Sequence, residues 1–468
     1  MNLRSVFLIM LFLGMVLPSH SQDPPSKPDP QIAKMVTEIS PKNIEATVRK
    51  LVSFGTRNTL SSQDDPVRGI GAARDWIFAE FQKISAACGG CLEVEKQAFI
   101  QPANPRGRIP QPTQLTNVFA VLKGTSDPSR IYVVSGHYDS MCSSPTDAKC
   151  DAPGANDDAS GIAVSIELAR VMSKRKFDST IVFMAVPGEE QGLLGATHYA
   201  DEAKKAAVNI EAMFTNDIVG GVTSQKNSKF RNKVRVFSEG VPSSETEQEA
   251  NTRRSVGGEN DSTSRQLARY VKEQSDRYLK DFGVWMIYRR DRYGRGGDHQ
   301  PFLTNGFPAV RFTESDEDYT HQHQNVRTDD KGTFYGDSVE FVDFAYTANI
   351  CRVNLVALAS LASAPAKPKG VGLITGGLNN DSVLKWDPSS DVDLAGYEVV
   401  WRDTTAAEWT NGQFVGNVTT YTAKAMSKDN YFFGVRAVDK AGHKSPVVYP
   451  RPAQAPRPTG SPTPTPSQ

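Results

Sequence analysis

The fold of this chain is decided by four segments: IYVVSGHYDS (131–140), PGANDDASG (153–161), TIVFMAVPGEEQG (180–192) and AMFTND (212–217). Three of them contain short apolar runs, which are typical of buried strands. Each run ends in side chains that can bind a metal or move a proton, namely His137 and Asp139, Glu189 and Glu190, and Asp217. The segment with Asn156-Asp157-Asp158 is expected to begin a helix. A histidine and carboxylates gathered at strand ends predict a metal-centred hydrolytic site.

Strand-like and helix-like patterns alternate around these segments. Helical spacing is found at 32–54 with a break at Pro41, and at 68–85, 193–205, 262–279 and 339–362. Strand patterns are found at 92–100, 116–123, 181–186, 284–288 and 308–313. The alternation predicts an α/β domain with a mostly parallel central sheet flanked by helices. The polar stretch 220–254 is expected to pass over the sheet and to form a wall of the substrate cleft.

The chain divides into five predicted parts. Residues 1–21 resemble a signal peptide, because Arg4 precedes a short apolar run and small residues follow it; an uncleaved membrane anchor is the alternative. Residues 22–363 are predicted to be the catalytic domain and 364–369 a linker. Residues 370–450 change to short strand patterns, and 451–468 form a Pro/Thr-rich tail that we expect to be disordered.

The 370–450 segment resembles a fibronectin type III β-sandwich of minimal length. Trp386 is its expected core anchor, and alternating apolar residues in 431–438 indicate a half-buried strand. We expect this all-β domain to tether the protein to a surface or polymer, with a simple spacer as the alternative.

The composition excludes long-range electrostatic partners. Lys+Arg and Asp+Glu balance at 53 each, so neither nucleic acid nor an anionic membrane is expected to bind. No apolar run after the leader is expected to span a membrane. We therefore expect a secreted monomer, extracellular or periplasmic, that acts on peptides or proteins.

Export would permit disulfides among the five cysteines. Cys88 and Cys91 lie in a CGGC turn, and Cys142 and Cys150 bracket the loop after His137, so two local pairs are the simplest arrangement. Cys351 would then remain a buried free thiol.

Each polar motif has an ordinary explanation when it is taken alone. His137 could be a satisfied core histidine, although Asp139, two residues along a strand, can accept a hydrogen bond from its second nitrogen. Glu189 and Glu190 could lie in a solvated loop, and helix capping explains one acidic residue at 156–158. Their joint occurrence favours a metal site with three carboxylates and one or two histidines, a set that suits zinc.

As a set, these motifs resemble the secreted zinc aminopeptidases of the bacterial leucyl-aminopeptidase type, which are related to the transferrin receptor and glutamate carboxypeptidase. The resemblance covers about 32–362 and rests on the GHxDS motif at 136–140, the Glu-Glu pair and the strand-end aspartate. It implies two zinc ions per chain and Glu189 as the catalytic base. Asp139, which can fix the tautomer of His137, is the second predicted catalytic residue. It implies that the metal ligands are His137, Asp157, Glu190, Asp217 and His321, with Asp157 bridging the ions.

The resemblance leaves the last ligand open between two histidines. His321 is preferred because Asn325 follows it at the spacing of the family's aspartate, and His323 is the alternative. From the residues alone, His137 could share an ion either with Asp157 and Asp217 or with Glu190. The resemblance also implies that Gly297-Asp298-His299 lines the cleft.

Two other functions fit parts of the same pattern. One is a glutaminyl cyclase with a single zinc ion, which the full ligand set argues against. The other is a catalytically silent binding protein on the same scaffold, which the presence of Glu189 argues against. The sequence does not determine whether a free amine or a free carboxylate is recognised.

Overall fold

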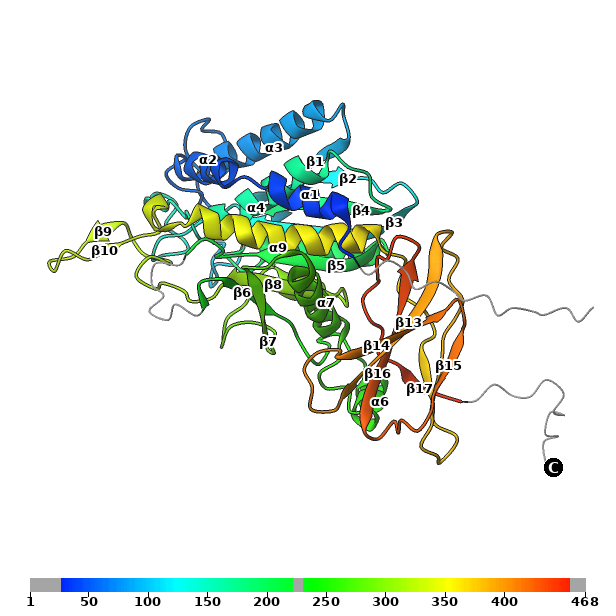
Figure 1. Ribbon diagram of the computed structural model, residues 1–468. Helices are drawn as coiled ribbons and strands as arrows, with labels where there is room; N and C mark the ends of the chain where they lie inside the picture. Colours follow the sequence, from blue (N-terminus) through cyan, green and yellow to red (C-terminus); the bar gives the residue numbers. More distant parts are fainter. Residues whose placement is uncertain (1–26, 222–229, 455–468) are drawn as a thin grey trace, which may run out of the picture.

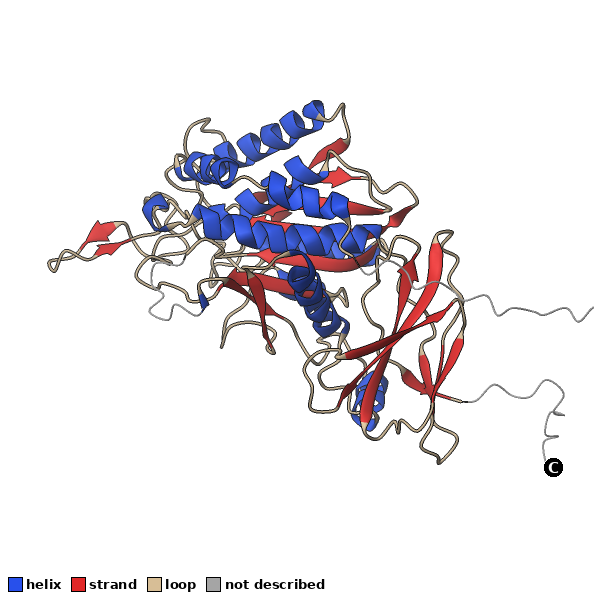
Figure 2. Cartoon of the chain, viewed as in Figure 1, coloured by secondary structure: helices blue, strands red, loops and turns tan. Residues whose placement is uncertain are grey.

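The computed structural model describes residues 27–221 and 230–454 of the chain (Figure 1). The predicted signal peptide and residues 455–468 of the predicted tail lie outside these residues. An eight-stranded sheet with helices on both faces forms the larger part, and two small sheets form the carboxy-terminal part (Figure 2). The predicted fold class is confirmed.

The helices are α1 (Pro30–Glu38), α2 (Pro41–Val52), α3 (Ile70–Ala87), α4 (Ala159–Met172), α5 (Leu194–Lys205), α6 (Glu247–Ser255), α7 (Thr263–Tyr278), α8 (His299–Thr304), η2 (Val339–Phe341) and α9 (Phe344–Ser363). The central sheet contains β1 (Leu92–Gln101), β2 (Thr113–Leu122), β3 (Asp127–His137), β4 (Ser179–Val186), β5 (Asn209–Asn216), β6 (Lys233–Phe237), β7 (Gly283–Ile287) and β8 (Ala309–Glu314). A two-stranded ribbon pairs β9 (Arg327–Thr328) with β10 (Phe334–Tyr335).

The sheet order is β1-β2-β4-β3-β5-β8-β6-β7, and the central neighbours β4, β3, β5 and β8 run parallel. Strands β1 and β2 join antiparallel at one edge, and β6 pairs antiparallel with β8. Strand β6 lies in the polar stretch that was expected to pass over the sheet. That expectation is wrong for this strand, because Val234, Val236 and Phe237 are buried.

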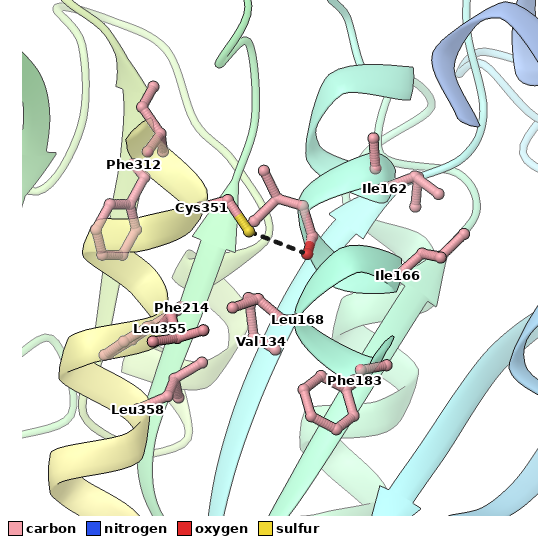
Figure 3. Packing of buried hydrophobic residues seen from close by; sticks show 14 of the residues in the cluster. Val134, Ile162, Ile166, Leu168, Phe183, Phe214, Phe312, Cys351, Leu355 and Leu358 are labelled. Carbon is pink, nitrogen blue, oxygen red and sulfur yellow. Dashed lines mark hydrogen bonds between the residues drawn. The ribbon is translucent and has the colours of Figure 1, made fainter. Parts of the chain in front are cut away.

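Side chains that alternate along the central strands fill two cores. On one face, Val134 and Phe214 pack with helices α4 and α9 in the cluster of Figure 3. On the other face, Val133 and Met213 pack with α5 and α8. By length and apolar composition alone, helix α9 could cross a membrane. Most of it, however, is buried inside the protein. The buried free thiol predicted at Cys351 lies on this helix.

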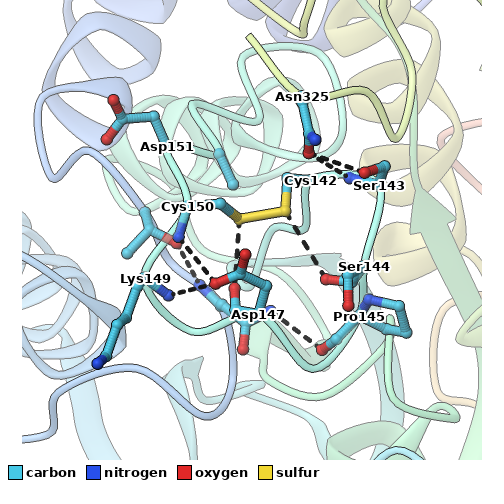
Figure 4. The surroundings of a disulfide bond; sticks show 12 residues. Cys142, Ser143, Ser144, Pro145, Asp147, Lys149, Cys150, Asp151 and Asn325 are labelled. Atoms are coloured by element: carbon cyan, nitrogen blue, oxygen red, sulfur yellow. Dashed lines mark hydrogen bonds between the residues drawn. A yellow bond between two sulfur atoms is a disulfide. The ribbon is translucent and has the colours of Figure 1, made fainter.

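Both predicted disulfides, Cys88–Cys91 and Cys142–Cys150, are confirmed. The second closes the loop that follows β3 (Figure 4). In this loop the backbone nitrogen and Oγ of Ser143 donate hydrogen bonds of 3.2 and 2.8 Å to Oδ1 of Asn325. The closed loop therefore holds the distant segment that carries His321 and His323.

The carboxy-terminal part contains two small sheets. One has the order β15 (Thr420–Ala423), β12 (Ser382–Lys385), β11 (Gly372–Ile374) and β17 (Arg451–Ala453). The other has the order β14 (Asn411–Gly416), β13 (Leu394–Asp403) and β16 (Tyr431–Asp439). Trp386 is buried and packs at a ring distance of 5.3 Å from Tyr397 in their shared core. The fibronectin resemblance itself stays a prediction.

Charged side chains join this carboxy-terminal part to α7, which lies beside it in Figure 1. Asp261 accepts hydrogen bonds of 2.7 Å from Arg269 of α7 and from Arg402 of β13, with both arginines buried. Arg436 of β16 also contacts Glu273 of α7 at 2.7 Å. The buried ion pairs of Asp261, together with the partly exposed Arg436–Glu273 pair, connect the two parts.

Candidate metal centre

The polar ends of three neighbouring strands meet at one edge of the sheet. Strand β3 ends at His137, β5 ends just before Asp217, and Pro187-Gly188 leads from β4 to Glu189 and Glu190. Because β4, β3 and β5 are parallel neighbours, their carboxyl ends lie together, as in other open α/β sheets that bind ligands there. The expected convergence of these residues is confirmed.

Two groups of three potential ligands share Asp157. In the first, Nε2 of His137 lies 3.1 Å from Oδ1 of Asp157 and 3.8 Å from Oδ1 of Asp217. In the second, Nε2 of His323 lies 3.0 Å from Oδ2 of Asp157 and 3.0 Å from Oε1 of Glu190. Each oxygen of Asp157 thus faces one group, which is the arrangement of a bridging carboxylate between two ions.

The chemistry of these donors fits zinc. Zinc is bound tetrahedrally by histidine nitrogen and carboxylate oxygen at about 2.0–2.2 Å, which separates neighbouring ligand atoms by about 3.3 Å. The distances between donor atoms in both groups lie near that value. In addition, His137 Nε2 and Glu190 Oε1 are buried without a hydrogen-bond partner among the described residues. Buried polar atoms without partners are rare in proteins, and a cation would satisfy these two.

The electrostatics also favour a cation. Burial raises the pKa of Glu189 well above its usual range, and the charges of Asp217 and Glu190 add to the rise, although His137 opposes it. Burial would also raise the pKa of Asp157, but the close contacts of its carboxylate with His137 and His323 outweigh burial and hold that pKa well below its usual range. Several buried carboxylates crowded together are costly unless positive charge compensates them.

Asp139 positions both strand ends. Its carboxylate accepts hydrogen bonds of 3.2 Å from the backbone nitrogens of Glu189 and Glu190. Nδ1 of His137 lies 3.1 Å from the carbonyl oxygen of Asp139 and 3.4 Å from its Oδ1. One side chain therefore orients the histidine ring and holds the Glu-Glu pair in place.

Asp158, next to the bridging residue, has a structural role. It is the N-cap of α4, where its Oδ1 accepts a hydrogen bond of 2.9 Å from the Gly161 nitrogen. Its Oδ2 accepts another from the backbone nitrogen of His137, at 3.0 Å. Helix capping thus accounts for one acidic residue of the 156–158 motif and leaves Asp157 free for the metal.

A cavity of about 280 Å³ opens onto the candidate ligands. Glu189, Glu190, Asp157, Asp217 and His323 lie on its wall. The remaining lining residues come from loops: Arg108, Gly192, Leu193, Arg292, Arg295, Gly296 and Gln322. Both residues of the Glu-Glu pair line this cavity, and Glu189 is the less buried of the two.

Comparison with known proteins agrees with this geometry. Residues 117–333 match the model of peptidase family M28. A probable zinc metalloprotease of Pyrenophora tritici-repentis is 49% identical over 92% of this chain and 88% of its own length. Another, from Leptosphaeria maculans, is 49% identical over 91% of this chain and 98% of its own. The chain belongs to peptidase family M28.

Solved structures support the M28 fold. LapB from Legionella pneumophila has a TM-score of 0.51 and 20% identity, covering 73% of this chain and 78% of LapB. The LapA aminopeptidase of the same organism has a TM-score of 0.50 and 18% identity, covering 73% of this chain and 76% of LapA. At these identities the likeness concerns the fold alone.

Within this M28 fold, the structure corrects the choice of the last ligand. His323 joins Asp157 and Glu190, whereas the predicted His321 does not. The ring of His321 stacks on Phe341 at 3.6 Å, and its Nδ1 lies 3.2 Å from the Gly336 carbonyl oxygen. His323 has a positive φ of 53°, which turns its side chain toward the metal centre.

The segment Gly297-Asp298-His299, expected at the cleft in a supporting role behind the ligands, directly follows Gly296 of the cavity lining. Asp298 and His299 are buried behind the cavity, and Gly296 is the neighbour that lines it. Nε2 of His299 lies 2.7 Å from the Arg290 carbonyl oxygen, so this ring supports the loop before α8. Burial raises the pKa of Asp298 to about 7, with Asp139 and Asp217 adding to the rise and His137 opposing it.

Arg311 is a functional contact that sequence reasoning missed. It is fully buried on β8, and its Nη1 lies 2.7 Å from Oδ2 of Asp217. This leaves Oδ1 of Asp217 facing His137, so Arg311 orients the carboxylate. An arginine between the apolar residues Val310 and Phe312 of the strand AVRFTE was the available signal.

Proposed function

We propose that this chain is a secreted aminopeptidase that hydrolyses N-terminal peptide bonds with two zinc ions. The observation that carries the proposal is the pair of ligand groups that share Asp157, with Glu189 on the wall of the same cavity. His137, Asp157 and Asp217 would hold one ion, and Asp157, Glu190 and His323 the other.

The bound zinc would polarise the peptide carbonyl and make water nucleophilic at neutral pH. Glu189 is placed to accept the proton from the attacking water and to return it to the leaving amine nitrogen. Asp139 keeps Glu189 in position through the hydrogen bond to its backbone nitrogen. Arg311 holds Asp217 in one orientation, so the ligand set is ordered before substrate arrives.

Family membership and the LapA likeness support peptidase chemistry, since the similar fungal proteins are called probable zinc metalloproteases and LapA an aminopeptidase. The two ligand groups favour two ions over the single ion of a glutaminyl cyclase. The presence of Glu189 beside a complete ligand set disfavours a silent binding protein.

A comparison of one peptide in two forms tests the proposal. We expect the zinc-loaded protein to hydrolyse the unblocked peptide at least about tenfold faster than the N-acetylated form. Acetylation removes the charge of the α-amine, and the loss of one charged hydrogen bond costs about 1.5–3 kcal/mol. Product would be followed by chromatography, and zinc would be counted by atomic emission. Faster cleavage of the acetylated form would instead indicate a carboxypeptidase, and one zinc per chain would favour the cyclase.

The choice of His323 over His321 has its own test. We expect His323→Ala to lower the zinc content from two ions to one per chain and to remove most activity, because the second group loses its only nitrogen donor. His321→Ala is the matched control, since that ring contacts Phe341 instead, and it should retain both ions. Zinc loss in His321→Ala alone would contradict the assignment.

We further propose that the carboxy-terminal sheets act as a tether or spacer and that the protein works outside the cytosol. The two disulfides support an oxidising compartment. The buried ion pairs of Asp261 support a carboxy-terminal part that stays docked on the catalytic part during function.

A further inference from the structure

The loop between β7 and α8 is rich in arginine. It reads YRRDRYGRGG over residues 288–297, with arginines at 289, 290, 292 and 295. Two of these, Arg292 and Arg295, lie on the wall of the metal cavity. Arg108, from the loop between β1 and β2, lies on the same wall and donates a hydrogen bond to the carbonyl oxygen of Glu190. Arginines from two distant loops thus meet beside the candidate metal centre.

These three arginines differ in how fully their donors are used. Arg292 is largely buried and contacts Asp291 and Glu317 at 3.1 Å each, and the Gly296 carbonyl oxygen at 2.9 Å. Its guanidinium is therefore occupied in holding the loop. The side chain of Arg295 is 30% exposed, and its contacts to Glu317 and Gln322 both use Nη1. A guanidinium has five N–H donors, so Arg295 keeps donors for a ligand.

Arg108 is similarly available. It is exposed, and within the described ranges its one hydrogen bond runs from Nη1 to Glu190. This bond ties the arginine to the backbone of a candidate metal ligand. Its Nε and Nη2 remain open to solvent or to a substrate.

Arginines outnumber the carboxylates that they contact beside this part of the cavity wall. Three arginines, Arg235, Arg292 and Arg295, contact the single carboxylate of Glu317 at 2.8, 3.1 and 2.8 Å. With Asp291, which also contacts Arg292, three guanidinium groups share two carboxylates, and Arg108 adds a further positive charge on the cavity wall. Arginine binds carboxylates with strong, charge-assisted hydrogen bonds because its fork of donors matches their geometry.

We propose that Arg108 and Arg295 select substrates that carry a carboxylate close to the scissile bond. This carboxylate belongs either to an acidic side chain or to the free carboxyl terminus of a short peptide. The inference rests on the proposed peptidase function and adds its substrate class. Arg108 and Arg295 are specificity residues in this scheme, and Arg292 holds the loop on which Arg295 stands.

Four matched dipeptides test the inference and separate the two sources of the carboxylate: Leu-Glu, Leu-Gln, Leu-Glu-amide and Leu-Gln-amide. Leu-Gln-amide carries no carboxylate and so cannot form the charged hydrogen bond. We therefore expect kcat/KM for the preferred carboxylate-bearing peptide to exceed that for Leu-Gln-amide by about tenfold or more. A preference for Leu-Gln over its amide identifies the terminal carboxylate. A preference for Leu-Glu-amide over Leu-Gln-amide identifies the side chain.

The variants Arg295→Gln and Arg108→Gln should each reduce this preference by at least about threefold, mainly through KM, while zinc content stays unchanged. Arg289→Gln is the matched control, because Arg289 is exposed on the same loop and lies outside the cavity lining. It should keep the full preference.

A binding measurement separates failure of this inference from failure of the peptidase function. Dissociation constants of the four dipeptides would be measured by calorimetry on the Glu189→Gln variant, which needs no turnover. Tighter binding of the acidic peptides that is lost in Glu189→Gln/Arg295→Gln supports the inference even if no peptide is cleaved. Equal dissociation constants for all four peptides, or no detectable binding, would overturn it.

Discussion

Glu189→Gln is expected to lower kcat by at least about 100-fold while the protein keeps its bound zinc, because general acid–base catalysis typically contributes 10²–10⁴-fold. Gln has nearly the same shape and keeps the backbone nitrogen that donates to Asp139. It cannot accept and return a proton. The loss should appear in kcat more than in KM, since Glu189 belongs to neither ligand group.

The control for this variant is Glu202→Gln on the exposed face of α5, where the carboxylate pairs with Lys205. Its kcat should match that of the unchanged protein. Steady-state kinetics and a zinc count on the same samples check both variants. Near-normal turnover in Glu189→Gln would show that another group moves the proton.

Asp261→Ala is expected to cost about 3–5 kcal/mol of stability, because it leaves two buried arginines without their shared anion. Arg269 and Arg402 have side chains that are 4% and 1% exposed, and both lie 2.7 Å from the carboxylate. Urea unfolding followed by tryptophan fluorescence would measure the loss, since the indole of Trp409 donates to Gln266 at this same junction.

Asp276→Ala on helix α7, which begins just after Asp261, is the matched control for Asp261→Ala. Asp276 forms an exposed pair with Lys272, and exposed pairs contribute little to stability. If both variants unfold at the same urea concentration, the Asp261 cluster does not hold the two parts together. A separate early transition in Asp261→Ala would indicate that the carboxy-terminal sheets detach before the catalytic part unfolds.

Much of the fold and site was predictable because the information was local. Apolar runs defined the central strands, and the polar residues directly after them had to meet at one sheet edge once those strands were parallel. His137, Glu190 and Asp217 follow from this rule, whereas Asp157 lies just before the start of helix α4. The two disulfides follow from short spacing.

The remainder depended on contacts that sequence patterns do not encode. His321 and His323 are two residues apart, and the choice between them rests on one positive φ and on the position of Phe341. Strand β6 was missed because its five residues are flanked by polar segments. Arg311 could be seen in the sequence, but its partner Asp217 lies on a different strand.

The hydrogen bonds between Ser143 and Asn325 bear on how the second metal position responds to reduction. They connect the loop closed by Cys142–Cys150 to a segment about 180 residues later in synthesis, two residues beyond His323. While both cysteines remain reduced, no covalent bond closes the loop of residues 142–150. The loop then samples more conformations and holds Asn325 less firmly. We therefore expect that reducing the Cys142–Cys150 disulfide loosens the segment that carries His323 and weakens metal binding there.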